Sequence, residues 1–211
     1  ASGVRLGDVS VQAQYRLTEF HEGSSLPTIS LQLQQTLPSG KYDRLGNRPG
    51  DGLGSGANTT TLQLNTQTYF WLANGRILRM RLNVAQSVSG KAHVEDVSVY
   101  GTSKGFRGNA RPGNSFFVDA AWEYSLSRRW VLALDVTYRR NHGTRLNGVT
   151  LPGYGEARIH RNSGSSEAFG FAPALEYSWS ANLGVLFGTR VITGCHTPTT
   201  ITPAIAINYV H

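Results

Sequence analysis

Two arginines stand two positions apart in the segment GRILRMRLNVAQSVSG, which covers residues 75–90. Arg79 and Arg81 alternate with apolar residues, which form this row: Leu78, Met80, Leu82 and Val84. Successive side chains of a β-strand point to opposite faces, so the spacing predicts both guanidinium groups on one face and the apolar row on the other. Guanidinium groups bind carboxylates and phosphates through paired hydrogen bonds. The polar face therefore calls for acidic partners or anionic ligands.

Acidic and basic residues recur at similar spacing in other alternating segments. The charged residues that we predict on polar faces are Arg16, Arg79, Arg81, Asp119, Glu123, Asp135, Arg139, Glu176 and Arg190. Two interpretations compete for these rows. The charges could line a pore and select solutes by charge. Alternatively, they could pair across strands into a structural lattice that plugs a narrow lumen, and we favour this pairing.

Residues for catalysis or metal binding do not form a recognisable pattern. The six histidines include no pair at the i, i+2 or i, i+4 spacing of metal ligands, and the chain has no Gly-x-Ser-x-Gly motif. Cys195 is the single cysteine, so no internal disulfide can form, and we interpret it as an inert loop thiol. We therefore predict no catalytic residue, no metal and no cofactor.

Nine segments with two-residue periodicity would position the charged rows. They cover residues 8–20, 27–38, 58–71, 75–90, 114–126, 129–141, 166–178, 181–193 and 199–210. No apolar run approaches the roughly 20 residues of a membrane-spanning helix, so the pattern predicts an all-β chain. A β-sandwich and a transmembrane β-barrel both fit nine such strands. The length of the segments favours the barrel, because globular strands typically have about 5–6 residues.

Two further features favour an antiparallel transmembrane β-barrel. Aromatic residues gather near the strand ends, where interfacial rings of barrels lie. The connections also alternate in length: 39–57, 90–113 and 141–165 are long, whereas the Leu-Ala-Asn-Gly turn at 72–75 is short. We therefore expect residues 1–211 to form one outer-membrane barrel domain, with apolar rows facing lipid and charged rows facing the lumen.

The loop sorting also predicts where the ends of the barrel lie. It places residues 1–7 on the long-loop side and the last strand's end on the opposite, periplasmic side. Bacterial barrels normally have an even number of strands and two periplasmic termini. We therefore expect an odd number of strands before Ala1, and the alternative is a nine-stranded barrel closed by a parallel pair.

Three stretches of the first third of the chain carry a family resemblance. They are GDVSVQAQYRL at 7–17, LPTISLQLQQTLPSGKYD at 26–43 and Gly-Ser-Gly at 54–56. They resemble the meta-pathway phenol-degradation family of outer-membrane proteins, and the later hairpins fit the same plan. The resemblance implies a barrel of about twelve strands, of which this chain would lack roughly the first three. It also implies the uptake of hydrophobic or aromatic growth substrates. Outer-membrane barrels commonly end in an aromatic residue, whereas here Tyr209 lies two residues before the final His211.

The charge of the chain bears on its partners. The net charge is +7 and the pI is near 9.9, but no run of Lys or Arg exceeds two residues, so we predict no nucleic-acid partner. Basic residues do recur in the long loops, Lys91 and Arg145 among them. Those predicted to contact lipopolysaccharide phosphates are Lys41, Arg44, Arg48, Lys104, Arg107, Arg111, Arg158 and Arg161.

The sequence thus predicts a bacterial outer-membrane barrel that acts as a passive channel or uptake protein for small, hydrophobic or aromatic solutes. Its partners would be membrane lipid, lipopolysaccharide and the solute. One alternative is a structural or interaction barrel with a charge-plugged lumen. A second alternative is a lipid-modifying enzyme of the outer membrane, with Ser and His at the lipid-facing rim.

Overall fold

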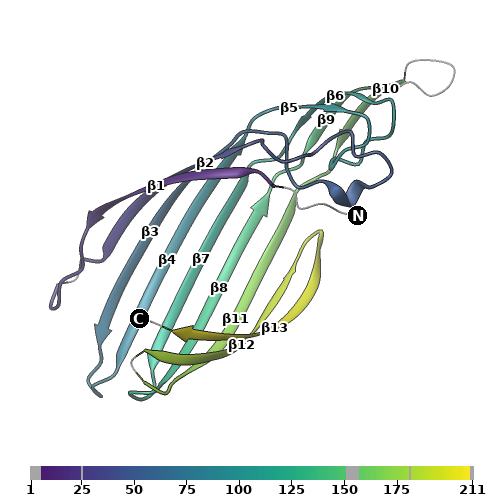
Figure 1. Ribbon diagram of the computed structural model, residues 1–211. Coiled ribbons are helices and arrows are strands. Elements are labelled where there is room, and N and C mark those ends of the chain that lie inside the picture. The colour runs from purple at the N-terminus through teal and green to yellow at the C-terminus, as the bar shows by residue number, and fades with distance from the viewer. Residues whose placement is uncertain (1–5, 25, 151–156, 181, 210–211) are drawn as a thin grey trace.

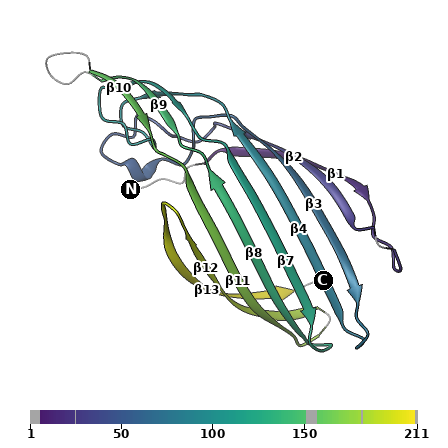
Figure 2. The same ribbon diagram turned by 180° about the vertical axis from the view of Figure 1, so that it is seen from behind.

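The computed structural model describes residues 6–24, 26–150, 157–180 and 182–209, and its largest unit is a nine-stranded sheet (Figures 1 and 2). The strand order is β1-β2-β3-β4-β7-β8-β11-β12-β13, and every neighbouring pair is antiparallel. The strands are β1 (Val9–Thr18), β2 (Thr28–Leu37), β3 (Thr59–Trp71), β4 (Ile77–Ser89), β7 (Ser115–Ser125), β8 (Trp130–Asn141), β11 (Ser166–Ser178), β12 (Leu183–Gly194) and β13 (Thr197–Tyr209). The predicted all-β, antiparallel class and all nine predicted strands are confirmed.

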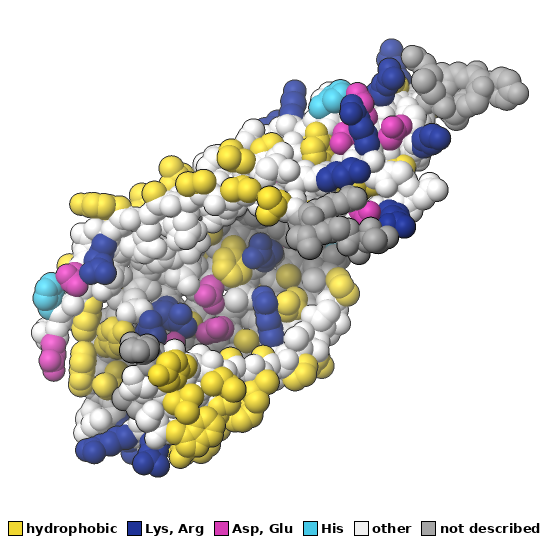
Figure 3. Space-filling model, viewed as in Figure 1, with side chains coloured by type: hydrophobic (Ala, Val, Ile, Leu, Met, Phe, Trp, Pro, Cys, Tyr) yellow, Lys and Arg dark blue, Asp and Glu magenta, His cyan; other side chains and the backbone are white. Residues whose placement is uncertain are grey.

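The two faces of the sheet differ in chemistry, as the alternation predicts. Large apolar side chains on one face stay exposed; Tyr15 and Ile207 each have 73% of their surface exposed. Other exposed members of this face are Val11, Leu17, Leu33, Leu62, Phe70, Phe171, Phe187, Ile201 and Ile205. The opposite face lies on the concave side of the curved sheet, and Figure 3 shows acidic and basic side chains gathered in this hollow.

The sheet is open in the described residues. β1 and β13 are its two edges, and each pairs with one neighbour only. The predicted closed barrel is therefore not observed, nor is the alternative of nine strands closed by a parallel pair. Among the same residues, no helix combines the length and the hydropathy needed to cross a membrane; the 3-10 helix η1 (Pro49–Asp51) has three residues.

The connections are sorted by length, as predicted, except at β12–β13, whose short turn lies at the opposite end from the other short turns. Short turns join β1 to β2, β3 to β4, β7 to β8 and β11 to β12 at one end, and the long connections lie at the other (Figure 1). Gly75 supplies the positive φ of 72° that the Asn-Gly turn needs. The β12–β13 connection is shorter than predicted, because β13 begins at Thr197 and leaves only Cys195 and His196 between the paired Gly194 and Thr197.

Two of the three long connections, 90–113 and 141–165, are not irregular loops, and here the prediction is wrong. They contain β5 (Ala92–Glu95), β6 (Arg107–Arg111), β9 (Arg145–Thr150) and β10 (Ala157–Asn162), which form a second sheet in the order β10-β9-β6-β5. These strands have four to six residues, too few for a period to stand out in the sequence. The sheet exists because β6 pairs with β9, which lies more than 30 residues away.

The small sheet carries the compact apolar core of the described residues. Phe106 and Val94 are completely buried, and they pack with Ala57, Ala92, Ala110 and Leu146. Gly108 and Gly148 face each other across β6 and β9, and a Cβ on either would lie within 2.7 Å of the Phe106 ring. The absence of two side chains therefore makes room for one aromatic ring.

We predict that Phe106→Ala destabilises the small sheet by about 3–5 kcal/mol, because it removes a fully buried ring and leaves a cavity. Native-state hydrogen exchange of the β6 and β9 amides measures this loss. Leu53→Ala is the control, since 47% of the Leu53 surface is exposed. Equal protection of the β6 and β9 amides in Phe106→Ala and the unsubstituted protein would contradict the prediction.

Candidate functional site

The charged centre of the concave face joins β4 to β7. Arg79 and Glu123 are direct partners in the register of these strands. Arg79 Nη1 lies 3.0 Å from Glu123 Oε2, and Arg81 Nη2 lies 2.9 Å from Glu123 Oε1. The three side chains retain only 26–34% of their exposure. One carboxylate thus bridges two half-buried guanidinium groups, an arrangement stronger than an exposed ion pair.

Hydrogen bonds extend this centre to the strand on the other side of β4. Arg79 Nη2 donates to Gln67 Oε1 at 2.6 Å, and Gln67 Nε2 donates to the Tyr69 hydroxyl at 2.8 Å. Further along the same face, Asn83 Nδ2 donates to Asp119 Oδ2 at 3.1 Å. The polar network therefore spans β3, β4 and β7, and its basic members come from β4.

The next strand, β8, pairs with β7 through its backbone, but no side-chain hydrogen bond among the described residues joins it to this network. The register sets Arg139 opposite Phe117, and its guanidinium carbon lies 4.6 Å from the centre of the Phe117 ring. Asp135 stands opposite Ala121 on the same face. Asp119 keeps one buried carboxylate oxygen without a hydrogen-bond partner in the described residues. Near the paired arginines the face therefore holds more carboxylates than those arginines neutralise.

The remaining predicted charges lie apart from this centre. Arg16 pairs with Glu19 at 2.9 Å in an exposed contact near the end of β1. Glu176 is half-buried opposite Leu186, and Arg190 is exposed opposite Thr202. Neither of the last two has an ion pair among the residues that the structure describes. The structure thus brings three of the nine predicted charges into direct contact: Arg79, Arg81 and Glu123.

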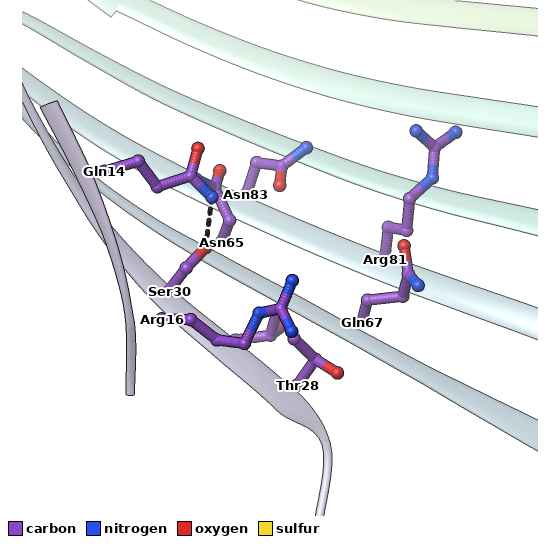
Figure 4. A pocket seen from close by; sticks show the side chains of 9 residues that line it. Gln14, Arg16, Thr28, Ser30, Asn65, Gln67, Arg81 and Asn83 are labelled. Carbon is purple, nitrogen blue, oxygen red and sulfur yellow. Dashed lines mark hydrogen bonds between the residues drawn. The ribbon is translucent and has the colours of Figure 1, made fainter. Parts of the chain in front are cut away.

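A cavity of about 270 Å³ lies beside the charged centre, where β1 to β4 meet the hollow (Figure 4). Its lining is mostly amide and hydroxyl, with Arg16 and Arg81 as the charged members: Gln14, Arg16, Thr28, Ser30, Asn65, Thr66, Gln67, Arg81 and Asn83. Gln14 Nε2 donates to Ser30 Oγ at 2.7 Å across β1 and β2. The predicted set of site residues followed charges and left these amides out, although amide side chains recur at every second position in residues 8–20 and 58–71.

The stretches that carry the family resemblance meet at one point above the sheet. Asp8 Oδ1 accepts a hydrogen bond from the Gly40 N–H at 2.9 Å, and Asp8 Oδ2 accepts from the N–H and hydroxyl of Ser55 at 2.7 and 3.0 Å. Gly40 and Gly54 approach so closely that a Cβ on Gly40 would lie 2.9 Å from the Gly54 Cα. The Gly-Asp, Ser-Gly and Gly-Ser-Gly elements therefore form one structural junction.

Tyrosines from the long connections close this junction. The Tyr100 hydroxyl donates a short hydrogen bond to the Ser55 carbonyl oxygen, and burial raises the pKa of Tyr100 to about 12. The Tyr42 ring covers Gly56, whose φ of +66° and missing side chain fit the contact. The family motif thus anchors the start of β1 to the small sheet. This structural role accounts for the motif without any catalytic role.

The predicted basic rim lies at the end that carries the small sheet, and its side chains are exposed: Lys41, Arg44, Arg48, Lys104, Arg107, Arg111, Arg158 and Arg161. Arg44 pairs with Glu95, and this hydrogen bond holds the pKa of the Glu95 carboxyl below its usual range. None of the other seven has an ion pair within the described part of the chain. Their contact with lipopolysaccharide stays a prediction.

The histidines and the cysteine lie apart from one another in the described residues, except for the neighbours Cys195 and His196. The described residues contain no cluster of three or more His, Cys, Asp or Glu side chains that could hold a metal. Cys195 Sγ lies 3.4 Å from His196 Nδ1 at the exposed β12–β13 turn. His142 and His160 bond to asparagines, and no hydrogen bond joins a serine hydroxyl to a histidine ring in this part of the chain. His211 lies outside the described residues.

Fold and site together define an all-β protein whose nine-stranded antiparallel sheet exposes an apolar face and holds a charged network on its concave face. The family described as "Putative MetA-pathway of phenol degradation" matches residues 1–194, so the chain belongs to that family. This confirms the resemblance carried by the first third of the sequence. No curated protein matches the chain.

We predict that Glu123→Gln lowers the free energy of unfolding by about 1–2 kcal/mol, because two half-buried guanidinium groups lose their charged acceptor. Urea unfolding followed by tryptophan fluorescence measures the change. Glu19→Gln is the matched control, since its pair with Arg16 is exposed and contributes little. The two variants would have equal stability if the bridge did not contribute.

We also predict that Asp8→Asn loosens the connection between β2 and β3, because an amide nitrogen cannot accept the hydrogen bonds of Ser55. Opening should become easier by about 1–3 kcal/mol, and cleavage after Lys41 and Arg44 about tenfold faster or more. Limited trypsin digestion with mass spectrometry measures these rates. Glu22→Gln, in the exposed β1–β2 turn, should digest like the unsubstituted protein, and equal rates for Asp8→Asn would refute the anchoring role.

Proposed function

We propose that this protein is a β-barrel of the bacterial outer membrane that acts as a passive channel or uptake protein for small solutes. The observation that carries the proposal is the two-faced sheet: its apolar face stays exposed over nine long strands, while its concave face is polar and charged. The exposed apolar face suits contact with the hydrocarbon of a lipid bilayer, and the polar concave face suits contact with water. Membership of the phenol-degradation family accords with this function.

The sorted connections support an orientation for the barrel. Short turns at one end and long, structured connections at the other are the asymmetry of outer-membrane barrels, whose long loops face outward. The small sheet would then stand at the outer mouth, together with its exposed basic side chains. Lipopolysaccharide phosphates are the anions that these side chains would meet there.

The hollow beside the charged centre suggests how a solute would pass. Amides and hydroxyls line the cavity of about 270 Å³, and Arg81 connects it to the ion pairs. Small aromatic solutes with a hydroxyl group, the phenols of the family description, could exchange hydrogen bonds with this lining. We therefore propose phenolic compounds as the first solutes to test, in keeping with the predicted aromatic class.

A second candidate function rests on the bridge itself. Because Glu123 holds both Arg79 and Arg81, and Gln67 extends the network to β3, the charges could close the lumen instead of lining an open path. The protein would then be a structural or interaction barrel. The third candidate, a lipid-modifying enzyme with a Ser–His pair at its rim, stays a prediction without a supporting contact in the described residues.

Single-channel conductance of the full-length protein in a planar bilayer tests the channel. We expect discrete conductance steps in the unsubstituted protein. In Arg79→Ala/Arg81→Ala the cation-to-anion permeability ratio should rise about twofold or more, because Asp119, Glu123 and Asp135 then outnumber the remaining Arg139 near this centre. Addition of phenol to one chamber should reduce the current if the solute enters the same path.

The control is Arg128→Ala/Arg129→Ala, which removes the same charge from the exposed β7–β8 turn. Its selectivity should equal that of the unsubstituted protein. A folded protein that never conducts would contradict the channel and favour the plugged barrel. An equal change of ion selectivity in both double variants would show that Arg79 and Arg81 do not lie on the permeation path.

A further inference from the structure

A second polar hollow lies where the chain crosses between the two sheets. Residues 112–114 lead from β6 of the small sheet to β7 of the large sheet, and residues 142–144 lead from β8 back to β9. The two crossings lie side by side, since the His142 N–H donates to the Asn114 carbonyl oxygen at 2.9 Å. Between them opens a cavity of about 260 Å³. Its lining is Arg111, Pro112, Gly113, Asn114, His142, Gly143 and Arg145.

The register of the small sheet sets two like charges face to face at this cavity. Arg111 of β6 is the direct cross-strand partner of Arg145 of β9. Like charges directly opposite each other destabilise a sheet unless an anion lies between them. Neither guanidinium has an ion pair or hydrogen bond in the described part of the chain, and the lining contains no carboxylate. Ten N–H donors are therefore available from these two side chains alone.

The backbone of the two crossings adds neutral donors. A Cβ on Gly113 would lie 1.7 Å from the His142 carbonyl oxygen, and a Cβ on Gly143 would lie 2.2 Å from Asn162 Oδ1. Glycine is thus required at both positions, and the N–H groups of both bond to no atom of the described residues. Unpaired backbone N–H groups in a concave loop form anion-binding sites.

Two side chains between the arginines are already held in place. His142 Nδ1 lies 3.1 Å from the Asn114 carbonyl oxygen, which can only accept, so Nδ1 carries the proton of this hydrogen bond. Asn114 Oδ1 accepts from the Ser89 N–H at 3.4 Å. The Asn114 NH₂ group bonds to no atom of the described residues, so it remains available as a donor at the cavity that Asn114 lines. The site is therefore rich in donors and positively charged, and the strand register fixes its spacing.

We infer that this cavity between the crossings, lined by Arg111, Arg145 and Asn114, is a binding site for a phosphate group. Guanidinium groups match the oxygens of phosphate in bidentate pairs, and two of them suit a doubly charged anion better than a single carboxylate. The volume is below the roughly 300 Å³ at which pockets for drug-sized ligands begin, so the site fits a small anion or the exposed head of a larger molecule. The inference does not require that the sheet forms a channel.

Titration calorimetry on the full-length, folded protein tests the site with inorganic phosphate as the probe. The unsubstituted protein should bind phosphate, and Arg111→Gln/Arg145→Gln should bind it more weakly by about tenfold for each arginine removed. Arg128→Gln/Arg129→Gln is the matched control, because it removes the same charge from two exposed arginines of the β7–β8 turn, at the other end of the molecule (Figure 1). Its affinity should equal that of the unsubstituted protein.

A third variant separates loss of the site from loss of the fold. Arg111→Lys/Arg145→Lys keeps both positive charges but not the forked donors, and should bind phosphate with an affinity between the other two. Circular dichroism compares the strand content of all variants. Equal affinity in the folded Gln variant and in the unsubstituted protein would overturn the inference. An equal loss in the β7–β8 turn control would also overturn it, because net charge alone would then explain binding.

The physiological phosphate could be free or part of a glycolipid, and a second titration distinguishes the two. Detergent micelles with a phosphorylated glycolipid are compared with micelles that contain its dephosphorylated form. Tighter binding of the phosphorylated micelles than of inorganic phosphate, lost in Arg111→Gln/Arg145→Gln, identifies a headgroup site. Binding of inorganic phosphate alone identifies a site for a soluble anion. Failure of both probes to bind the unsubstituted protein would refute the site, whatever the conductance experiment shows.

Discussion

The two-residue period of the β-strand is the constraint on which the rest of this structure depends. Because nine long strands largely keep this period in register, most apolar rows meet apolar rows and most polar rows meet polar rows, with exceptions such as Arg139 opposite Phe117. A shift of one residue in any strand would carry charges such as Arg81 onto the apolar face. The sheet thus gains its two chemistries from pairing alone, without a core beneath it.

The small sheet, unlike the large one, is stabilised by a buried apolar core. Its strands are short, and their stability comes from a compact core around Phe106 and from paired glycines that admit its ring. Asp8, Gly40 and Ser55 then tie this unit to the start of the large sheet. The residues that carry the family resemblance therefore have a structural role, because they connect the two sheets. This role explains why they lie outside the charged centre.

Charge is distributed unevenly over the molecule, and this difference separates the two candidate sites. On the concave face Arg79 and Arg81 share Glu123, so the positive charges there are already paired. At the crossings between the sheets Arg111 and Arg145 oppose each other with no carboxylate between them. In the first arrangement the arginines already have a carboxylate partner and lie next to a polar cavity, whereas the second has unmatched donors and favours an external anion.

The sequence by itself determined the all-β class, the nine long strands, their faces and the sorting of the connections, because these follow from local periodicity and turn residues. It also placed Arg79, Arg81 and Glu123 on polar faces. Only the tertiary structure decided that Glu123 pairs with β4 while Arg139 lies against Phe117, since these contacts depend on register. The small sheet and the opposition of Arg111 and Arg145 likewise depend on pairing between β6 and β9. These strands are far apart in the chain and too short to be predicted from their periodicity.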